Sequence, residues 1–197
     1  QLLPELNIGG VERGTKDFSK VLIDRGHKSI VISNGGIFEK DIINDGGKHI
    51  KLPIHKKNLS SLFLSKQLKS IYEDEMPDIV HVRSRMPAWI NFLAFKKMPI
   101  KPILVSTFHG LYSTPIYSKV MAKVDHTIAI SNTVKNYIID TYKVSESMIT
   151  TIPRGCDPKT FNKEPASDDW IARWYEEFPQ TSNKIILTLP TRISKWK

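Results

Sequence analysis

The sequence is poor in cysteine and has no long apolar run. Cys156 is the single cysteine among 197 residues, so no internal disulfide can form, which fits a reducing compartment. No apolar run approaches the roughly 20 residues that a membrane-spanning helix needs. The N-terminus also shows no basic segment followed by an apolar core, as a secretory signal would have. We therefore expect a cytoplasmic protein.

Several kinds of reactive site are also missing. No group of Cys, His, Asp and Glu has the spacing of a metal site. There is no Gly-x-Ser-x-Gly elbow, and Cys156 has no partner in the sequence that would identify it as a nucleophile. No aromatic-basic pattern matches a known RNA-binding module. The sequence therefore gives no support to a metalloenzyme, a serine hydrolase or an RNA-binding domain.

Basic residues outnumber acidic ones by 29 to 20, which gives a net charge of +9. One explanation is attraction to a phosphate-rich partner, such as a nucleotide sugar, an anionic membrane surface or a nucleic acid. The other is compositional bias, because Lys, Ile and Asn are abundant throughout the chain. The basic residues are scattered, with only short groups at 55–57 and 96–97. Nothing resembles a recognition helix, and we expect no nucleic-acid partner.

Short β-branched runs alternate with helix-like segments, as is typical of parallel βαβ units. Several runs are almost continuous Ile, Val and Leu, as expected for strands that helices cover on both faces. The expected strands are 1–6, 29–33, 49–52, 79–83, 103–108, 127–131, 149–152 and 184–189. The expected helices are 11–25, 88–97, 132–142, 170–178 and one from Ser60 or Ser61 to Glu75. This order predicts an α/β fold with a Rossmann-like, doubly wound, mainly parallel sheet.

The segment at 157–183 interrupts this alternation with three prolines and an acidic pair. Residues 184–189 then have the pattern of a new strand, followed only by 190–197. Because one strand and a loop cannot form a domain, we expect the chain to be truncated there. The predicted organisation is an N-terminal domain at 1–165, a connection at 166–183 and the first strand and loop of a second domain at 184–197.

Unusual residues fall at the carboxyl ends of the expected strands, where ligands bind in open α/β sheets. Gly9-Gly10 follows the first strand and runs into a helix. Two glycines let the backbone approach a ligand, and the helix N-terminus offers free N–H groups to an anion. A tight turn that needs positive φ is the alternative. The pair lacks the third glycine of a dinucleotide fingerprint and the Lys-Ser/Thr of a P-loop.

Two further groups lie at strand ends. Arg83 and Arg85 suit an anionic or hydroxyl-rich ligand, and Trp89 could stack on a sugar. A solvated loop with Trp89 in the core is the alternative. His109 precedes Gly110 after another strand and is well placed to face a cleft. A core histidine satisfied by the backbone is the alternative there.

The end of the chain forms a basic loop directly after an expected strand. Arg192 and Lys197 could hold a diphosphate leaving group as fixed cations, without a metal. Many strands are followed by basic loops that bind nothing, so an ordinary loop is the alternative.

Taken together and in order, these segments resemble the retaining glycosyltransferases usually grouped as family 4, which have the GT-B fold. The order and spacing of the motifs are specific, although each motif alone is weak. The matching segments are Gly-Gly-x-Glu-Arg at 9–13, Gly-His at 26–27, His-Gly at 109–110, Ile-Ala-x-Ser at 128–131, Ile-Pro-x-Gly-x-Asp at 152–157 and the loop with Arg192 and Lys197. The resemblance spans nearly the whole chain and implies the N-terminal half of a GT-B fold.

The resemblance also implies a reaction. A hexose would pass from a nucleoside diphosphate sugar to a glycan or glycolipid acceptor with retention of configuration. Arg192 and Lys197 would neutralise the diphosphate without a metal or another cofactor, and the amides of Gly9 and Gly10 would hydrogen-bond it. His109 would position the donor sugar rather than act as a general base.

The stretch at 83–89 is similar to a bacterial branch of lipopolysaccharide-core glycosyltransferases, and we assign Arg83, Arg85 and Trp89 to the acceptor side. A lipid-linked acceptor would place the protein on the cytoplasmic face of a membrane, with the anionic surface as a further partner. Thr191 departs from the family, which has glycine there and a Glu-x(7)-Glu motif that would lie beyond Lys197. This chain alone is therefore expected to be inactive. The alternatives are a GT-B epimerase or hydrolase, and a non-enzymatic basic module that binds nucleic acid or membrane.

Overall fold

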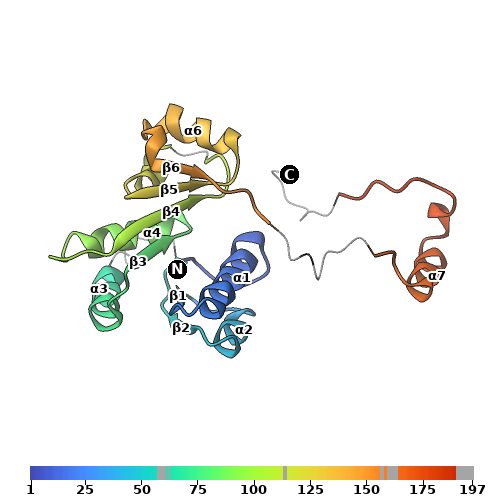
Figure 1. Cartoon of the computed structure of the whole chain (residues 1–197), viewed down its shortest axis with the longest axis horizontal. Helices are drawn as coiled ribbons and strands as arrows, with labels where there is room; N and C mark the ends of the chain where they lie inside the picture. Colours follow the sequence, from blue (N-terminus) through green and yellow to red (C-terminus); the bar gives the residue numbers. More distant parts are fainter. Residues whose placement is uncertain (57–60, 62, 113–114, 156–157, 159–163, 190–197) are drawn as a thin grey trace. The chain divides into compact units, whose positions relative to one another are not determined.

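The structure, a computed structural model, describes residues 1–56, 61, 63–112, 115–155, 158 and 164–189. The chain forms two compact units, Gln1–Arg154 and Gly155–Lys197. The first unit is an α/β domain that carries the sheet (Figure 1). It ends before the predicted boundary at 165, and the roles assigned to 166–183 and 184–197 stay predictions.

Strands and helices alternate along the first unit, as predicted. The strands are β1 (Ile30–Ser33), β2 (Lys48–Lys51), β3 (Ile79–Val82), β4 (Ile103–Phe108), β5 (His126–Ala129) and β6 (Ile149–Thr151). The helices are α1 (Gly10–Asp24), α2 (Glu39–Asn44), α3 (Leu64–Glu75), α4 (Arg85–Phe95), α5 (Pro115–Ser118) and α6 (Asn132–Tyr142), with the 3₁₀ turns η2 (Lys119–Ala122) and η3 (Glu146–Met148). The short elements α2, α5 and η2 were not expected from the sequence.

The described strands pair in parallel, in the orders β1-β2 and β3-β4-β5-β6. Leu2 joins the two sets, because it forms parallel bridges to Ile32 on β1 and to Val82 on β3. Its amide donates to the carbonyl of His81 at 2.8 Å, and its carbonyl accepts from the amide of Arg83 at 2.9 Å. The start of the chain therefore lies in the middle of a doubly wound parallel sheet, which confirms the predicted fold class.

The apolar core lies on both sides of this sheet. Phe108, Ile90 and Ile138 are among its fully buried side chains. Helix α6 packs beside β5 and β6, and α3 packs on α4 (Figure 1). A smaller cluster under α2 holds Leu3, Leu6, Val31 and Ile42. These contacts fix the carboxyl ends of the strands relative to one another.

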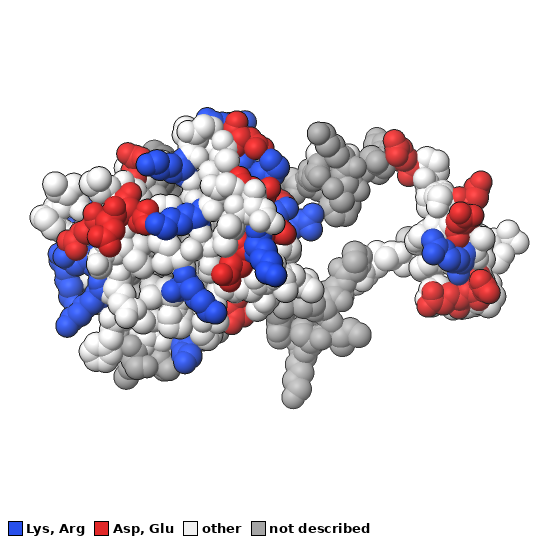
Figure 2. All heavy atoms as spheres, turned by 90° about the horizontal axis from the view of Figure 1, so that it is seen from below, with Lys and Arg blue, Asp and Glu red and all other residues white. Residues whose placement is uncertain are grey.

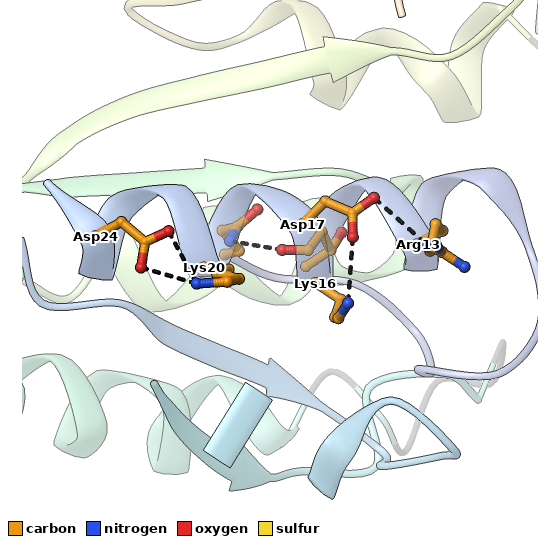
Figure 3. A network of polar contacts seen from close by, with 7 residues as sticks. Arg13, Lys16, Asp17, Lys20 and Asp24 are labelled. Carbon is orange, nitrogen blue, oxygen red and sulfur yellow. Dashed lines mark hydrogen bonds and ion pairs between the residues drawn. The ribbon is translucent and has the colours of Figure 1, made fainter. Parts of the chain in front are cut away.

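Helix α1 shows how most of its charge is used. Arg13 and Lys16 each lie 3.4 Å from the Asp17 carboxylate, and Lys20 lies 2.9 Å from Asp24, along one exposed face (Figure 3). Exposed pairs of this kind contribute about 0.3–0.5 kcal/mol each. The basic residues of α1 are therefore a solvated helix face. Acidic side chains also lie among the basic ones over the N-terminal unit in the view of Figure 2.

The strand expected at 184–189 does not form. Residues 185–189 have no regular structure and pair with none of the described residues, and Ile185 and Leu187 are each 94% exposed. A β-rich segment becomes a strand only when a neighbouring strand accepts its backbone hydrogen bonds. The sequence pattern shows the preference of this segment but not its partner.

The second unit contains α7 (Asp168–Glu177) and the 3₁₀ turn η4 (Pro179–Thr181). The hydroxyl of Ser167 caps α7 by accepting from the amide of Trp170 at 3.3 Å. The acidic pair, Asp168 and Asp169, lies in the first turn, where negative charge favours the helix dipole. These residues are therefore a helix start, two residues earlier than the sequence predicted. None of the helices in the described part of either unit is both long and apolar enough to cross a membrane.

The contact between α3 and α4 contains a buried polar pair that can be tested. The hydroxyl of Tyr72 donates to Asn91 Oδ1 at 2.6 Å, and both side chains are buried. Tyr72→Phe should lower the free energy of unfolding by about 1–3 kcal/mol, because the Asn91 oxygen would lose its partner. Urea denaturation would measure this loss. The double variant Tyr72→Phe/Asn91→Leu should recover part of it, and a single variant as stable as the wild type would contradict the role of the bond.

Candidate ligand site at the carboxyl ends of the strands

The strand order reverses at Leu2, between β1 and β3. In a doubly wound sheet the crevice at such a reversal, outside the carboxyl ends of the strands, is the usual ligand site. Segments that are far apart in the sequence meet there. They are Gly9-Gly10 at the start of α1, Arg83 after β3, His109 after β4 and Arg154 after β6.

The glycine pair is required by close approach rather than by backbone conformation. Gly9 is the N-cap of α1 with a φ of 174°, and Gly10 is the first residue of the helix. Neither has the positive φ that a tight glycine turn would need. A Cβ on Gly10 would lie 2.5 Å from Arg154 Nη1, and a Cβ on Gly9 would overlap the carboxylate of Glu12. Side chains of the site thus lie against the glycine backbone.

His109 is held from one side and open on the other. Arg154 Nη2 lies 2.9 Å from Nδ1 of the imidazole. Nε2 is buried and has no hydrogen-bond partner among the residues that the structure describes. A core histidine satisfied by the backbone, the alternative from the sequence, does not account for that nitrogen. Burial, and then the charges of Arg83 and Arg154, lower the pKa of His109 to about 3, so the ring is neutral at physiological pH.

Arg83 brings a second guanidinium to the same place. It is half-buried, and its Nη1 donates to Gln1 Oε1 at 2.9 Å. Its Nε is buried without a partner in the described part of the chain. Burial, and then the charge of Arg154, lower the pKa of Arg83 to about 10, while Glu12 acts in the opposite direction. Two guanidinium groups and the N-terminus of α1 therefore share one nearby carboxylate, which leaves an excess of positive charge suited to an anion.

The other two residues of the predicted acceptor side have different neighbours. The Arg85 guanidinium lies 4.9 Å from the ring centre of Tyr112 and 5.3 Å from that of Tyr117. Trp89 donates from its indole nitrogen to the carbonyl of Tyr117 at 2.9 Å and packs on Phe92. The alternative in which Trp89 packs in the core matches these contacts. The acceptor assignments of Arg83, Arg85 and Trp89 stay predictions.

Two cavities lie near these elements. One of about 360 Å³ is lined by Pro4, Glu5, His55, Ser84, Arg85, Met86 and Tyr117. It opens beside the candidate site at the carboxyl ends of the strands, because Ser84 and Arg85 follow β3 directly. A larger one of about 560 Å³ is bounded by Lys96, Lys101, Lys123 and the first residues of β4. It lies at the amino end of that strand, away from the converging guanidinium groups, so its size does not make it the candidate site.

Part of the predicted site lies outside the described residues. Arg192 and Lys197 belong to that part of the chain, and their assignment to a diphosphate stays a prediction. Within the described ranges no three His, Cys, Asp or Glu residues are grouped as a metal site would need. The residues available to bind a ligand are therefore the guanidinium groups, the imidazole and the backbone amides.

Arg154 was not assigned to the site from the sequence. It occupies the third position of the Ile-Pro-x-Gly-x-Asp segment, where the resembling family commonly has asparagine. That substitution was the available signal. Its contact with His109 joins residues 45 positions apart, which sequence spacing does not reveal.

Comparison with known families agrees with this geometry. Residues 8–160 match the family described as Glycosyltransferase Family 4. The chain belongs to this family. The match covers the converging segments from Gly9 to Arg154, so the candidate site lies wholly inside the family domain.

Solved structures of glycosyltransferases share the fold. A glycosyltransferase from Rickettsia africae is 33% identical, with a TM-score of 0.80 over 100% of this chain and 54% of its own. The Anabaena protein Alr3699/HepE, solved with UDP-glucose, is 15% identical, with a TM-score of 0.66 over 92% of this chain and 50% of its own. The lipopolysaccharide outer core galactosyltransferase WaaB is 15% identical, with a TM-score of 0.60 over 86% of this chain and 50% of its own.

A human protein is also similar in sequence. This relative, one of the subunits of phosphatidylinositol N-acetylglucosaminyltransferase, is 27% identical over 175 residues, which are 81% of this family 4 chain and 36% of the human protein. The chain thus spans between a third and about half of the relatives described here. The family 4 domain seen in this structure is the N-terminal half of a GT-B fold, as predicted.

The buried histidine gives the stability of this domain a pH dependence that can be measured. The pKa of His109 falls from 6.5 to about 3 on folding, so the unfolded chain binds more protons. The contribution of His109 is complete above about pH 6.5, and it is lost as the pH falls towards 3, by up to about 1.4 kcal/mol per pH unit. Burial also lowers the pKa of His81, which adds a dependence of the same sign.

His109→Gln should therefore reduce the loss of stability between about pH 7.5 and about pH 5, as measured by urea denaturation at each pH. The change should appear in the slope against pH. Parallel curves for the variant and the wild type would show that His109 is not buried in this way.

Proposed function

We propose that the protein carrying this domain is a retaining glycosyltransferase that moves a hexose from a nucleoside diphosphate sugar to a glycan or glycolipid. The observation that carries the proposal is the convergence of Arg83, Arg154 and the N-terminus of α1 around a neutral His109. This group lies at the reversal of strand order in a family 4 domain. Such a cluster suits a ligand with both a diphosphate and hydroxyl groups.

The chemistry of glycosyl transfer fits these groups. The bond between the anomeric carbon and the diphosphate oxygen breaks, which leaves an oxocarbenium-like sugar and a diphosphate with growing negative charge. Fixed cations and amides stabilise that charge without rearranging during the reaction. The amides of Gly9 and Gly10, with Arg192 and Lys197, take this role in the proposal. Because His109 is uncharged, it supplies a hydrogen bond to the donor rather than a charge.

The relatives support the substrate classes. The Anabaena protein was solved with UDP-glucose, a nucleoside diphosphate hexose. The WaaB protein is named for the lipopolysaccharide outer core, and the human relative is named for phosphatidylinositol. We extend these to a glycolipid acceptor in cell-surface polysaccharide or lipopolysaccharide synthesis, at the cytoplasmic face of a membrane. The net charge of +9 favours an anionic surface there.

The diphosphate assignment is tested by turnover of UDP- and GDP-sugars by the full-length protein with acceptor sugars present. Arg192→Ala and Lys197→Ala should each lower kcat by about a hundredfold or more, because each removes one fixed cation from the leaving group. Lys20→Ala, which removes a cation that pairs with Asp24 on the exposed face of α1, is the matched control and should change little. Full activity in both site variants would overturn the diphosphate assignment. Turnover without any acceptor would indicate a hydrolase or epimerase instead.

Metal dependence gives a separate test. Since protein cations neutralise the diphosphate in this mechanism, EDTA should leave the rate of transfer unchanged. The rate is measured before and after chelation, and then after addition of Mg²⁺ or Mn²⁺. A rate that falls with EDTA and returns with the metal would contradict the metal-free mechanism.

A further inference from the structure

The contact between Arg154 and His109 determines where the imidazole carries its proton. A guanidinium has only N–H donors and no acceptor. At 2.9 Å from Arg154 Nη2, His109 Nδ1 must therefore accept, which it can do only while it is unprotonated. A neutral imidazole has one N–H, and with Nδ1 as acceptor that hydrogen lies on Nε2.

The Nε2 hydrogen then points to nothing in the described chain. The atom is buried, and no described residue accepts a hydrogen bond from it. A buried N–H without a partner costs about 1–3 kcal/mol. Such a donor, at the carboxyl end of β4 and beside two guanidinium groups, fits an oxygen atom of a bound ligand.

The surroundings keep this arrangement across the physiological pH range. The charged or titratable groups that bear on the imidazole are Arg83 and His81 from β3 and its end, Arg154 after β6, and Tyr112 after β4. The guanidinium groups oppose a further positive charge on the ring. Protonation of Nδ1 would also break the bond to Arg154. The imidazole therefore stays neutral, with one nitrogen accepting and the other donating.

We infer that Arg154 is a positioning residue that holds His109 in the tautomer protonated on Nε2, so that His109 donates a hydrogen bond to an oxygen of the bound sugar nucleotide. The identity of the ligand rests on the proposed function, whereas the tautomer rests on the contact alone. Gly10 belongs to the same device, because a Cβ there would lie 2.5 Å from Arg154 Nη1 and would displace the guanidinium.

The tautomer can be observed directly. In protein labelled with ¹⁵N-histidine, multiple-bond ¹H–¹⁵N NMR spectra distinguish protonated from unprotonated ring nitrogens, and His109→Gln identifies the His109 signals. The wild type should show a protonated Nε2 and an unprotonated Nδ1, with no titration down to about pH 5. Arg154→Met should give a mixture of the two tautomers. Arg25→Met removes an exposed arginine at the far end of α1 and should leave the wild-type pattern.

Two results would overturn the inference. One is a wild-type His109 protonated on Nδ1, and the other is an Arg154→Met variant that keeps the wild-type tautomer. Gly10→Ala keeps the arginine but crowds its guanidinium, so it should change the His109 signals in the same direction as Arg154→Met. Unchanged His109 signals in Gly10→Ala would also count against the inference.

The role in ligand binding is measured by kinetics of the full-length protein with a nucleoside diphosphate sugar. Arg154→Met should lower kcat/KM for the donor by about tenfold to a hundredfold, the loss expected for one misdirected hydrogen bond to a charged or polar ligand. Arg25→Met should keep the wild-type value, and a wild-type value for Arg154→Met would contradict the role. If the wild-type protein turns over no sugar nucleotide, the proposed function fails while the NMR result still decides the tautomer.

Discussion

Leu2 holds the two halves of the sheet together, and the site depends on that pairing. Without its bridges to Ile32 and Val82, the β1-β2 pair and the four strands from β3 to β6 would be separate sheets. Because Leu2 lies between them, the chain winds outward from the centre in both directions. The same geometry puts the start of α1 next to the end of β3. Packing in the core thus decides which polar residues can meet.

The polar residues that meet there are arranged at some cost to the folded state. Burial disfavours the charge on Arg83, and Arg154 adds a like charge beside it. A protein gains little stability from such a group unless an anion joins it, since buried charges need partners. His109 responds by staying neutral. The missing Cβ of Gly10 lets Arg154 come close to the helix terminus. The site is therefore organised for a ligand rather than for stability.

Much of the fold was predictable because local patterns fix it. Buried runs of Ile and Val gave the strands of the first unit to within one or two residues, since hydrophobic periodicity follows burial. Helix α4 begins at Arg85, before the expected 88, because proline is tolerated in the first turn of a helix and Pro87 lies there. Partners that are distant in the sequence were not predictable. The pairing that 184–189 lacks and the contact of Arg154 with His109 both depend on such partners.

Arg154 is also the last residue of the first compact unit. Its side chain is fixed on the imidazole, while its backbone continues into Gly155 and the rest of the chain. One residue thus joins a hydrogen bond in the candidate site to the covalent connection with the second unit. A displacement of the backbone at this junction has only a single side chain between it and the ring of His109. The junction is a mechanical element as well as a linker.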